Sequence, residues 1–378
     1  MSEAARLTAE LVRIPSVNPA LDPDGAGEGA LARFVAAWAE VHGLETRWLG
    51  PSERPSVLVR LRGRGGGRTL LLNAHLDTVG VHAMEAPFEP RLRSGRMFAR
   101  GAMDMKASLA ACLLTLRDLQ RDGEPRGDVV LAAVADEEHD SIGTRAALAA
   151  LPDVDLAVVT EPTDLTLHVA HRGFAVVEVD LEGRASHTSQ PERGVNAVTH
   201  LGRLLARVEA ADRELRAAAP HPLLGHGGWQ AVLASGGQEL FTTPAAAHAA
   251  LERRTLPGQS AAGAEAEVAA MLHALAADDP QLRATTRTAV AREAFAAGPD
   301  DPAVAAVAAA AEAVTGRPPP RRGAPYWTDA ALIAEAGIPT VLYGPVGGGI
   351  HQPDEWVDLA SVDVLREVLG RVARDVSA

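Results

Sequence analysis

The chain has 378 residues, more than the ~250–300 at which one hydrophobic core usually stops growing, so we expect more than one domain. Its 47% hydrophobic and 22% charged residues are ordinary for a globular protein and exclude a disordered chain or a disulfide scaffold. Lys and Arg total 36 against 49 Asp and Glu, and the net charge of −13 argues against a surface that binds nucleic acid or anionic membranes.

Cysteine content and hydropathy exclude further classes of protein. The single cysteine, Cys112, excludes internal disulfides and multi-cysteine metal sites, and its apolar surroundings predict a buried structural thiol. The first fifteen residues are charged rather than apolar, which is unlike a signal peptide or an anchor. No run reaches the ~18 apolar residues that a membrane-spanning helix needs. We therefore expect a cytoplasmic protein with no membrane and no nucleic-acid partner.

Helical and strand patterns alternate at both ends of the chain, which predicts an α/β sandwich with a mostly parallel or mixed sheet. In the first part, helices are predicted over 4–12, 28–42 and 107–119 and strands over 56–61, 69–72, 128–135 and 156–160. After Pro299, helices are predicted over 303–314, 328–335 and 359–376 and a strand over 339–344.

Near Gly173 the pattern changes to a different plan. Strands are predicted over 174–181, 229–234, 246–251 and 283–292, and helices over 194–218 and 260–277. The order strand–helix–strand–strand–helix–strand is the split βαβ plan of a ferredoxin-like α+β domain. We therefore predict a discontinuous α/β catalytic domain over 1–172 and 295–378, with an inserted α+β domain over 173–294. The glycine clusters at 63–67 and 347–349 are interpreted as turns and loops.

Polar residues follow the strand predicted over 69–72. This strand runs on into His75 and Asp77, which the two-residue period of a strand places on the same side. A histidine oriented by a carboxylate is a common metal-ligand arrangement. Taken alone, this segment is explained equally well by a histidine at a strand end whose ring nitrogens are hydrogen-bonded within the protein. Asp104 lies just before a predicted helix, where an N-cap is the ordinary interpretation.

Further polar residues follow other predicted strands. Glu137 and Glu138 belong to the acidic cluster 136–140; such clusters usually form a solvated face, but this one directly follows a buried strand. Glu161 follows the next strand, and the glycine loop 347–349 leads to His351. Nitrogen and oxygen ligands without thiolates suit Zn²⁺, with Co²⁺ or Mn²⁺ as alternatives, and their number suffices for two ions.

These segments together resemble the M20 metallopeptidase family, which includes acetylornithine deacetylases, succinyl-diaminopimelate desuccinylases, aminoacylases and glutamate carboxypeptidases. The resemblance covers nearly the whole chain. It begins with Leu-Val-Arg-Ile-Pro-Ser-Val-Asn-Pro at 11–19, continues through the segments described above, and ends with His-Gln-Pro-Asp-Glu-Trp-Val at 351–357.

The resemblance implies a dinuclear zinc hydrolase. In this family pattern His75 and Glu161 hold one ion, Glu138 and His351 hold the other, and Asp104 bridges the two. The resemblance further implies that Asp77 orients His75 and that Glu137 is the general base that activates water and passes its proton to the leaving amine. Lys106 stands next to the bridging aspartate in a family motif, but we interpret it as a helix-start residue.

The inserted domain resembles the lid and dimerisation domain of the family, on Gly-Arg-Ala-Ser-His at 183–187 and Gly-Val-Asn-Ala at 194–197. The resemblance implies a homodimer in which His187 reaches the scissile carbonyl in the partner's active site. Arg254, in the segment 252–258, occupies the position that clamps the substrate's α-carboxylate, a task that suits a planar guanidinium. Its neighbour Arg253 is expected to face the other way as a surface charge.

Two departures from the family pattern bear on the substrate. Phe241 stands where many relatives have an asparagine that helps to hold substrate, and 347–349 replaces a Gly-Asp-type loop. The resemblance implies cleavage of an amide next to a free α-carboxylate, first of all by an N-acyl-amino-acid (acetylornithine-type) deacetylase. A carboxypeptidase or dipeptidase is the alternative, and a non-catalytic amino-acid-binding scaffold the remote one. Residues 326–329 are candidates to line the pocket, or a packed helix start.

Overall fold

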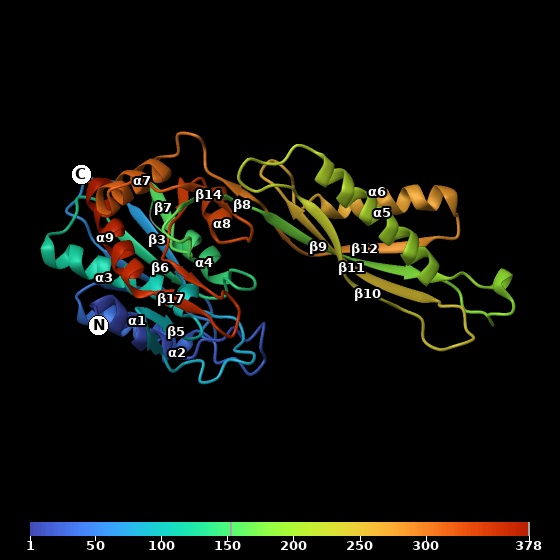
Figure 1. Cartoon of the computed structure of the whole chain (residues 1–378), viewed down its shortest axis with the longest axis horizontal. Helices are drawn as coiled ribbons and strands as arrows, with labels where there is room; N and C mark the ends of the chain where they lie inside the picture. The colour runs from blue at the N-terminus through green and yellow to red at the C-terminus, as the bar shows by residue number, and fades with distance from the viewer. Residues whose placement is uncertain (152, 377–378) are drawn as a thin grey trace. The chain divides into compact units, whose positions relative to one another are not determined.

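The structure is a computed structural model that describes residues 1–151 and 153–376. The chain divides into two compact units (Figure 1). Unit 1 comprises Met1–Val169, Ala297–Arg322 and Thr328–Ala378, and unit 2 comprises Ala170–Ala296 and Gly323–Trp327.

Unit 1 is built on a mixed β-sheet with the strand order β1-β2-β6-β3-β7-β15-β8. The pairs β3–β6, β3–β7 and β7–β15 are parallel, whereas β1–β2, β2–β6 and β15–β8 are antiparallel. The bounds are β1 (Glu45–Leu49), β2 (Ser56–Leu61), β3 (Leu70–His75), β6 (Val129–Val134), β7 (Leu156–Val159), β15 (Thr340–Leu342) and β8 (Leu167–His171). Every residue of β3, β6 and β7 is buried, as expected for parallel strands that are covered on both faces.

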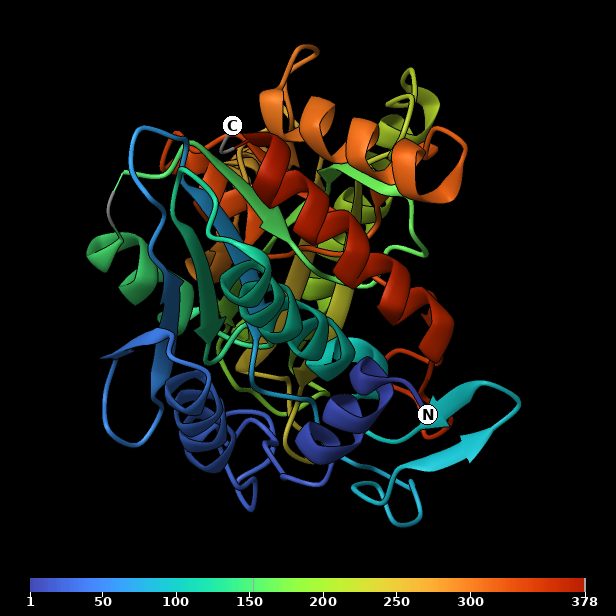
Figure 2. The same cartoon turned by 90° about the vertical axis from the view of Figure 1, so that its left-hand side faces the viewer.

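Helices cover both faces of this sheet (Figure 2). One hydrophobic cluster joins the sheet to α1 (Glu3–Val12), α2 (Gly29–Val41), α3 (Ala107–Asp122), α7 (Pro302–Thr315) and α9 (Leu359–Val376). Helices α4 (Ile142–Ala150) and α8 (Ala330–Glu335) contact β6 and β15, and their described residues supply no side chain to that cluster. These two helices therefore cover the other face.

A small antiparallel sheet stands beside the start of α3. Its strand order is β16-β17-β5-β4, with bounds β16 (Gly347–Gly348), β17 (Trp356–Asp358), β5 (Arg96–Phe98) and β4 (Arg91–Arg93). The glycines at 347–348 were predicted to form a loop only, and the structure corrects this. A Cβ at Gly347 would lie 2.5 Å from the Trp356 carbonyl oxygen, so only glycine allows this close pairing.

Unit 2 contains a four-stranded antiparallel sheet with the order β10-β11-β9-β12 and two helices on one face. The bounds are β9 (Gly173–Glu182), α5 (Ala197–Ala217), β10 (Gly228–Gly236), β11 (Ala246–Thr255), α6 (Ala264–Asp278) and β12 (Arg283–Arg292). Alternate residues of β9 are buried against α5 and α6. The last residues of β8 pair with β13 (Phe295–Ala296), and β14 (Arg321–Ala324) also pairs with β8.

The predicted fold class is confirmed: an α/β unit is interrupted by an α+β unit whose elements follow the predicted order. Strands 56–61 and 283–292 and helix 359–376 have the predicted bounds. Helix α8 begins at Ala330 rather than at 328. The prediction missed helix α4 and the short strands β1, β4, β5, β8, β13, β14 and β17. These strands have two to five residues, and β1, β4 and β5 are exposed at many positions, but the alanine-rich sequence of α4 did favour a helix.

The two faces of α5 generate a stability prediction. Leu204 is fully buried between α5 and the sheet of unit 2, whereas Val198 on the same helix is 38% exposed. We expect Leu204→Ala to destabilise the chain by about 2–5 kcal/mol, because it leaves a cavity in the core. Val198→Ala, the matched control, should change stability by less than about 0.5 kcal/mol. Thermal or urea unfolding measures both, and equal effects would contradict this packing.

Candidate metal centre

The candidate site lies at one edge of the unit 1 sheet, where parallel strands end together. His75 is the last residue of β3, Glu137 and Glu138 follow β6, and Glu161 follows β7. Because β3 runs parallel to both β6 and β7, their carboxyl ends meet at the same edge. The sequence placed these residues after separate strands, and the structure brings them together.

A first group of possible ligands is fully buried. The Nε2 atom of His75 lies 2.9 Å from Oδ1 of Asp104 and 3.7 Å from Oε1 of Glu161. One ligand atom from each of the three residues lies within 4.8 Å of the others, a spacing that one metal ion can span.

A second group shares Asp104 with the first. The Nε2 atom of His351 lies 3.3 Å from Oδ2 of Asp104 and 3.3 Å from Oε2 of Glu138. Asp104 thus turns one oxygen toward each group. This is the arrangement that a carboxylate needs in order to bridge two ions.

The charges and unpaired atoms of both groups fit divalent cations. Burial raises the pKa of Glu161 well above its usual range, with a further contribution from the Asp104 carboxylate. Burial and Asp104 also raise the pKa of Glu138, whose Oε1 atom is buried without a hydrogen-bond partner. So many close carboxylates need positive charge to remain ionised, and a set of imidazoles and carboxylates is suited to Zn²⁺ or a similar ion.

Without a metal ion, the carboxylates favour the protonated forms of the two imidazoles. Hydrogen bonds to the carboxylates of Asp104 and Glu138 raise the pKa of His351 to about 10. Burial opposes a charge on His75, but Asp104 and Glu161 nevertheless raise its pKa well above the usual value. Burial opposes ionisation of Asp104 too, yet its contacts with His351 and His75 hold its pKa below the usual range.

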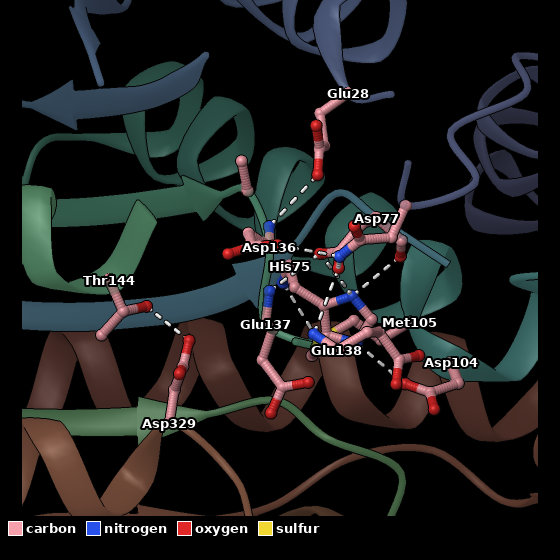
Figure 3. A network of polar contacts seen from close by, with 12 residues as sticks. Glu28, His75, Asp77, Asp104, Met105, Asp136, Glu137, Glu138, Thr144 and Asp329 are labelled. Carbon is pink, nitrogen blue, oxygen red and sulfur yellow. Dashed lines mark hydrogen bonds and ion pairs between the residues drawn. The ribbon is translucent and has the colours of Figure 1, made fainter. Parts of the chain in front are cut away.

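Glu137 is the carboxylate beside the two groups. Burial, together with Glu161 and Asp329, raises the pKa of Glu137 well above its usual range. Figure 3 shows its side chain between the His75–Asp104 pair and the Thr144–Asp329 pair. A basic carboxyl group in this place can accept a proton from a water molecule at the site.

Asp77 supports the site in a different way from the one predicted. The Nδ1 atom of His75 lies 2.9 Å from the main-chain oxygen of Asp77 and 3.6 Å from its carboxylate. The carboxylate instead accepts hydrogen bonds from the backbone N–H groups of Glu137 and Glu138, both at 3.1 Å (Figure 3). Asp77 therefore orients His75 through its backbone and holds the acidic loop through its side chain.

A buried polar network fixes the start of that acidic loop, and its members were not among the predicted site residues. Asn18 donates to Asp77 at 2.8 Å and to Asp136 at 3.0 Å. Arg54 donates to Glu28 and to Asp136, and the backbone N–H of Asp136 donates to Glu28 (Figure 3). The segment 11–19 was noted in the sequence only as a family-like opening, because no local pattern reveals such distant partners.

Asp329 is fully buried beside the site, directly before α8. Its Oδ2 atom accepts a hydrogen bond of 2.5 Å from Thr144, which in turn accepts one from Asn73 on β3. Burial raises the pKa of Asp329 to about 6. Of the two interpretations of 326–329, the packed helix start therefore holds for Asp329.

Asp104 belongs to an irregular segment, the π-helical turn 102–106. Its backbone is not helical (φ −117°, ψ 93°). The N-cap position of α3 is occupied by Lys106 and no side chain caps this helix, so the N-cap interpretation of Asp104 is wrong. Lys106 does stand at the start of α3, but it is fully buried and its Nζ donates to the Ile14 carbonyl at 2.7 Å. Burial lowers the pKa of Lys106 to about 7.

The predicted thiol environment is confirmed. Cys112 is fully buried in α3, and burial raises the pKa of its thiol to about 12. This thiol is therefore not a nucleophile at neutral pH.

The remaining predicted site residues belong to unit 2. His187 is exposed, and its Nδ1 atom lies 2.8 Å from the Ser189 hydroxyl. Arg254 is partly exposed at the end of β11 and donates to Glu252 at 2.7 Å. Its neighbour Arg253 is 3% exposed and donates to Glu267, so the prediction of a surface charge is wrong.

Comparison with known sequences matches the chain to one family and to enzymes that remove acyl groups. A family model for peptidase family M20/M25/M40 matches residues 71–375. The succinyl-diaminopimelate desuccinylase of Dinoroseobacter shibae is 29% identical over 395 residues, with 100% of both chains covered. The acetylornithine deacetylase of Proteus mirabilis is 28% identical over 383 residues, covering 97% of this chain and 95% of that enzyme.

Solved structures show the same fold. The aminopeptidase PepT of Bacillus cereus matches with a TM-score of 0.82 at 20% identity, covering 100% of this chain and 98% of that one. An M20 family metallo-carboxypeptidase of Sulfolobus solfataricus matches with a TM-score of 0.78 at 18% identity, covering 99% of both chains.

The matches and the candidate metal centre define the same class: the chain is a metallohydrolase that acts on amide bonds. More narrowly, it belongs to peptidase family M20, because the family model spans residues 71–375 of 378. In the described part of the chain, no helix combines the length and the apolar character that a membrane crossing requires.

Metal binding at this site should release protons from the imidazoles. His75 and His351 have raised pKa values in the metal-free site, and a metal can bind only their deprotonated nitrogens. We expect about one proton or more to be released per ion, and affinity to fall as the pH decreases from about 8 to about 6. Calorimetric titration in two buffers of different ionisation enthalpy measures the release. A binding enthalpy that is the same in both buffers would contradict these protonation states.

Proposed function

We propose that this protein is a dinuclear zinc enzyme that removes the acyl group from an N-acyl amino acid, with an N-acetylated, acetylornithine-type substrate as the first candidate. The observation that carries the proposal is the pair of ligand groups that share Asp104, with the free carboxylate of Glu137 beside them. The desuccinylase and deacetylase relatives support an acyl-amino-acid substrate.

In this proposal each ligand group holds one ion. His75 and Glu161 hold the first, Glu138 and His351 hold the second, and Asp104 bridges them. Two divalent cations would bring a charge of +4 against −3 from the three ligand carboxylates, which leaves a site that attracts an oxyanion. The bound ions would supply Lewis acidity toward the scissile carbonyl and lower the pKa of water.

Glu137 performs the proton transfers. Its carboxylate accepts a proton from the attacking water and delivers it to the nitrogen of the departing amine, so that the amide bond breaks and a carboxylate and an amine form. The two backbone hydrogen bonds that Asp77 accepts from Glu137 and Glu138 keep this base in place beside the ligands.

Unit 2 supplies the substrate contacts in this proposal. The Arg254 guanidinium binds the α-carboxylate of the substrate, and its partial exposure leaves it accessible to one. His187 contributes to the active site of a partner subunit in a homodimer. Exposed apolar side chains on unit 2 support such a contact, among them Leu233 on the edge strand β10, which is 64% exposed.

In this proposal Phe241 influences which side chains of the substrate are preferred. It is 73% exposed and has a left-handed backbone (φ 68°), which is uncommon for a bulky residue. Its carbonyl accepts the N–H of Thr188, so this ring lies on the loop next to His187. An aromatic ring there would favour an apolar group on the substrate over one that needs an amide partner.

Turnover of N-acetyl, N-succinyl and dipeptide panels would distinguish a deacylase from a peptidase.

Removing the base tests the chemistry. We expect Glu137→Gln to retain both metal ions and to lower kcat by about 10²–10⁴-fold, because the amide cannot accept a proton. Asp140→Asn, on the exposed part of the same loop, is the matched control and should stay close to wild-type activity. Steady-state kinetics with parallel metal analysis measures both. Full activity in Glu137→Gln would exclude Glu137 as the base.

Subunit mixing tests the role of His187. His187→Ala and Glu137→Gln should each be inactive as homodimers, whereas a mixed dimer contains one site with both wild-type residues. Random assortment should therefore restore about a quarter of wild-type activity, because half of the dimers are mixed and each has one intact site. Mixed dimers without activity, or a wild type that is active as a monomer in sedimentation, would rule out this role.

A further inference from the structure

Glu355 is a buried carboxylate that none of the roles above uses. It lies four residues after His351 and directly before β17, and it is 1% exposed. A buried acidic side chain is costly unless its oxygens are hydrogen-bonded, so its partners show what it does.

Both oxygens of Glu355 bind the backbone around Asp104. Oε1 accepts the N–H groups of Met103 at 2.8 Å and of Asp104 itself at 3.2 Å. Oε2 accepts the N–H of Gly101 at 3.1 Å and a guanidinium N–H of Arg100 at 2.5 Å. One carboxylate therefore accepts three backbone N–H groups and pairs with one positive charge.

The segment 101–104 needs these acceptors because it is irregular. Gly101 has a left-handed backbone (φ 76°) and Asp104 is non-helical, so the N–H groups of this turn lack the regular pairing of an α-helix. By accepting them, Glu355 sets the backbone path that turns one oxygen of the Asp104 side chain toward His75 and the other toward His351.

The same residue also holds the loop that carries His351. A Cβ on Gly349 would lie 2.9 Å from the backbone of Asp354 and from the Glu355 nitrogen, so this loop closes tightly on itself. The Glu355 carbonyl accepts the Ala99 N–H at 3.3 Å, and β17 continues into pairing with β5. Glu355 thus joins the His351 loop to the Asp104 turn.

The other ligands are anchored independently. His75 ends β3 and Glu161 follows β7, and both strands lie in the main sheet. A change at Glu355 would therefore disturb the group formed by Asp104, Glu138 and His351 more than the group formed by His75, Asp104 and Glu161.

We propose that Glu355 is a positioning residue of the metal centre, which fixes Asp104 relative to His351 and thereby sets the affinity for the ion of the second group. This inference rests on the proposed dinuclear function. Arg100, which is equally buried, neutralises the carboxylate and shares in this arrangement.

The test measures metal binding directly in the full chain. Equilibrium dialysis of the metal-free protein against Co²⁺, followed by absorption spectroscopy, gives separate affinities for the two ions. For Glu355→Gln we expect the second ion to bind about 10–100-fold more weakly, the loss typical when support behind a ligand is removed, with the first ion nearly unchanged. Asp354→Asn, an exposed charge on the same loop, is the matched control and should bind both ions as the wild type does.

A folded Glu355→Gln that binds both ions with wild-type affinity, or loses both equally, would overturn the inference. Circular dichroism establishes folding; if Glu355→Gln fails to fold, Glu355→Asp, which keeps the charge beside Arg100 but displaces the oxygens, is judged by the same criteria. A wild-type chain that binds no divalent ion would overturn the proposed function and this inference with it. A wild type with two ions and an unaltered variant would overturn the inference alone.

Discussion

Mutual repulsion among buried carboxylates is the constraint on which the rest of unit 1 depends. Glu138 and Glu161 have raised pKa values because they are buried close to Asp104, and the same carboxylates raise the pKa values of His75 and His351. Such a cluster would move apart unless the backbone held it, since like charges in a poorly solvated place cost several kcal/mol. A divalent cation turns the same repulsion into binding energy.

The fold resists this repulsion with two kinds of support. Parallel strands bring the ends of β3, β6 and β7 to one edge of the sheet, where main-chain hydrogen bonds fix their spacing. Loops that leave the sheet are held by buried side chains that accept backbone N–H groups: Asp77 holds the loop of Glu137 and Glu138, and Glu355 holds the turn of Asp104. Because these acceptors bind backbone N–H groups, they hold a candidate metal ligand in place while the lone pairs of its side chain stay available for a metal ion.

Unit 2 carries the residues that we propose to contact the substrate. Its sheet has one face packed against α5 and α6; His187 and Phe241 lie on loops outside that core, and Arg254 lies near the end of β11. Loops of this kind can change residue without disturbing either hydrophobic core. In the proposed function, a residue such as Phe241 can therefore differ from its counterpart in relatives without a change in the proposed ligands, since one fold can serve different substrates.

The sequence alone determined the order of the main elements and the inserted unit, because these follow from local hydrophobic periods, and it indicated candidate ligands as polar residues at strand ends. The tertiary structure decided what lies between distant segments. In the structure Arg253 and Asp329 are buried. His75 contacts the main-chain carbonyl of Asp77 more closely than its carboxylate, and Glu355 accepts the backbone N–H of Asp104. Residues 104 and 355 are brought together only by the folded chain, and hydrogen-bond partners so far apart leave no periodic pattern in a sequence.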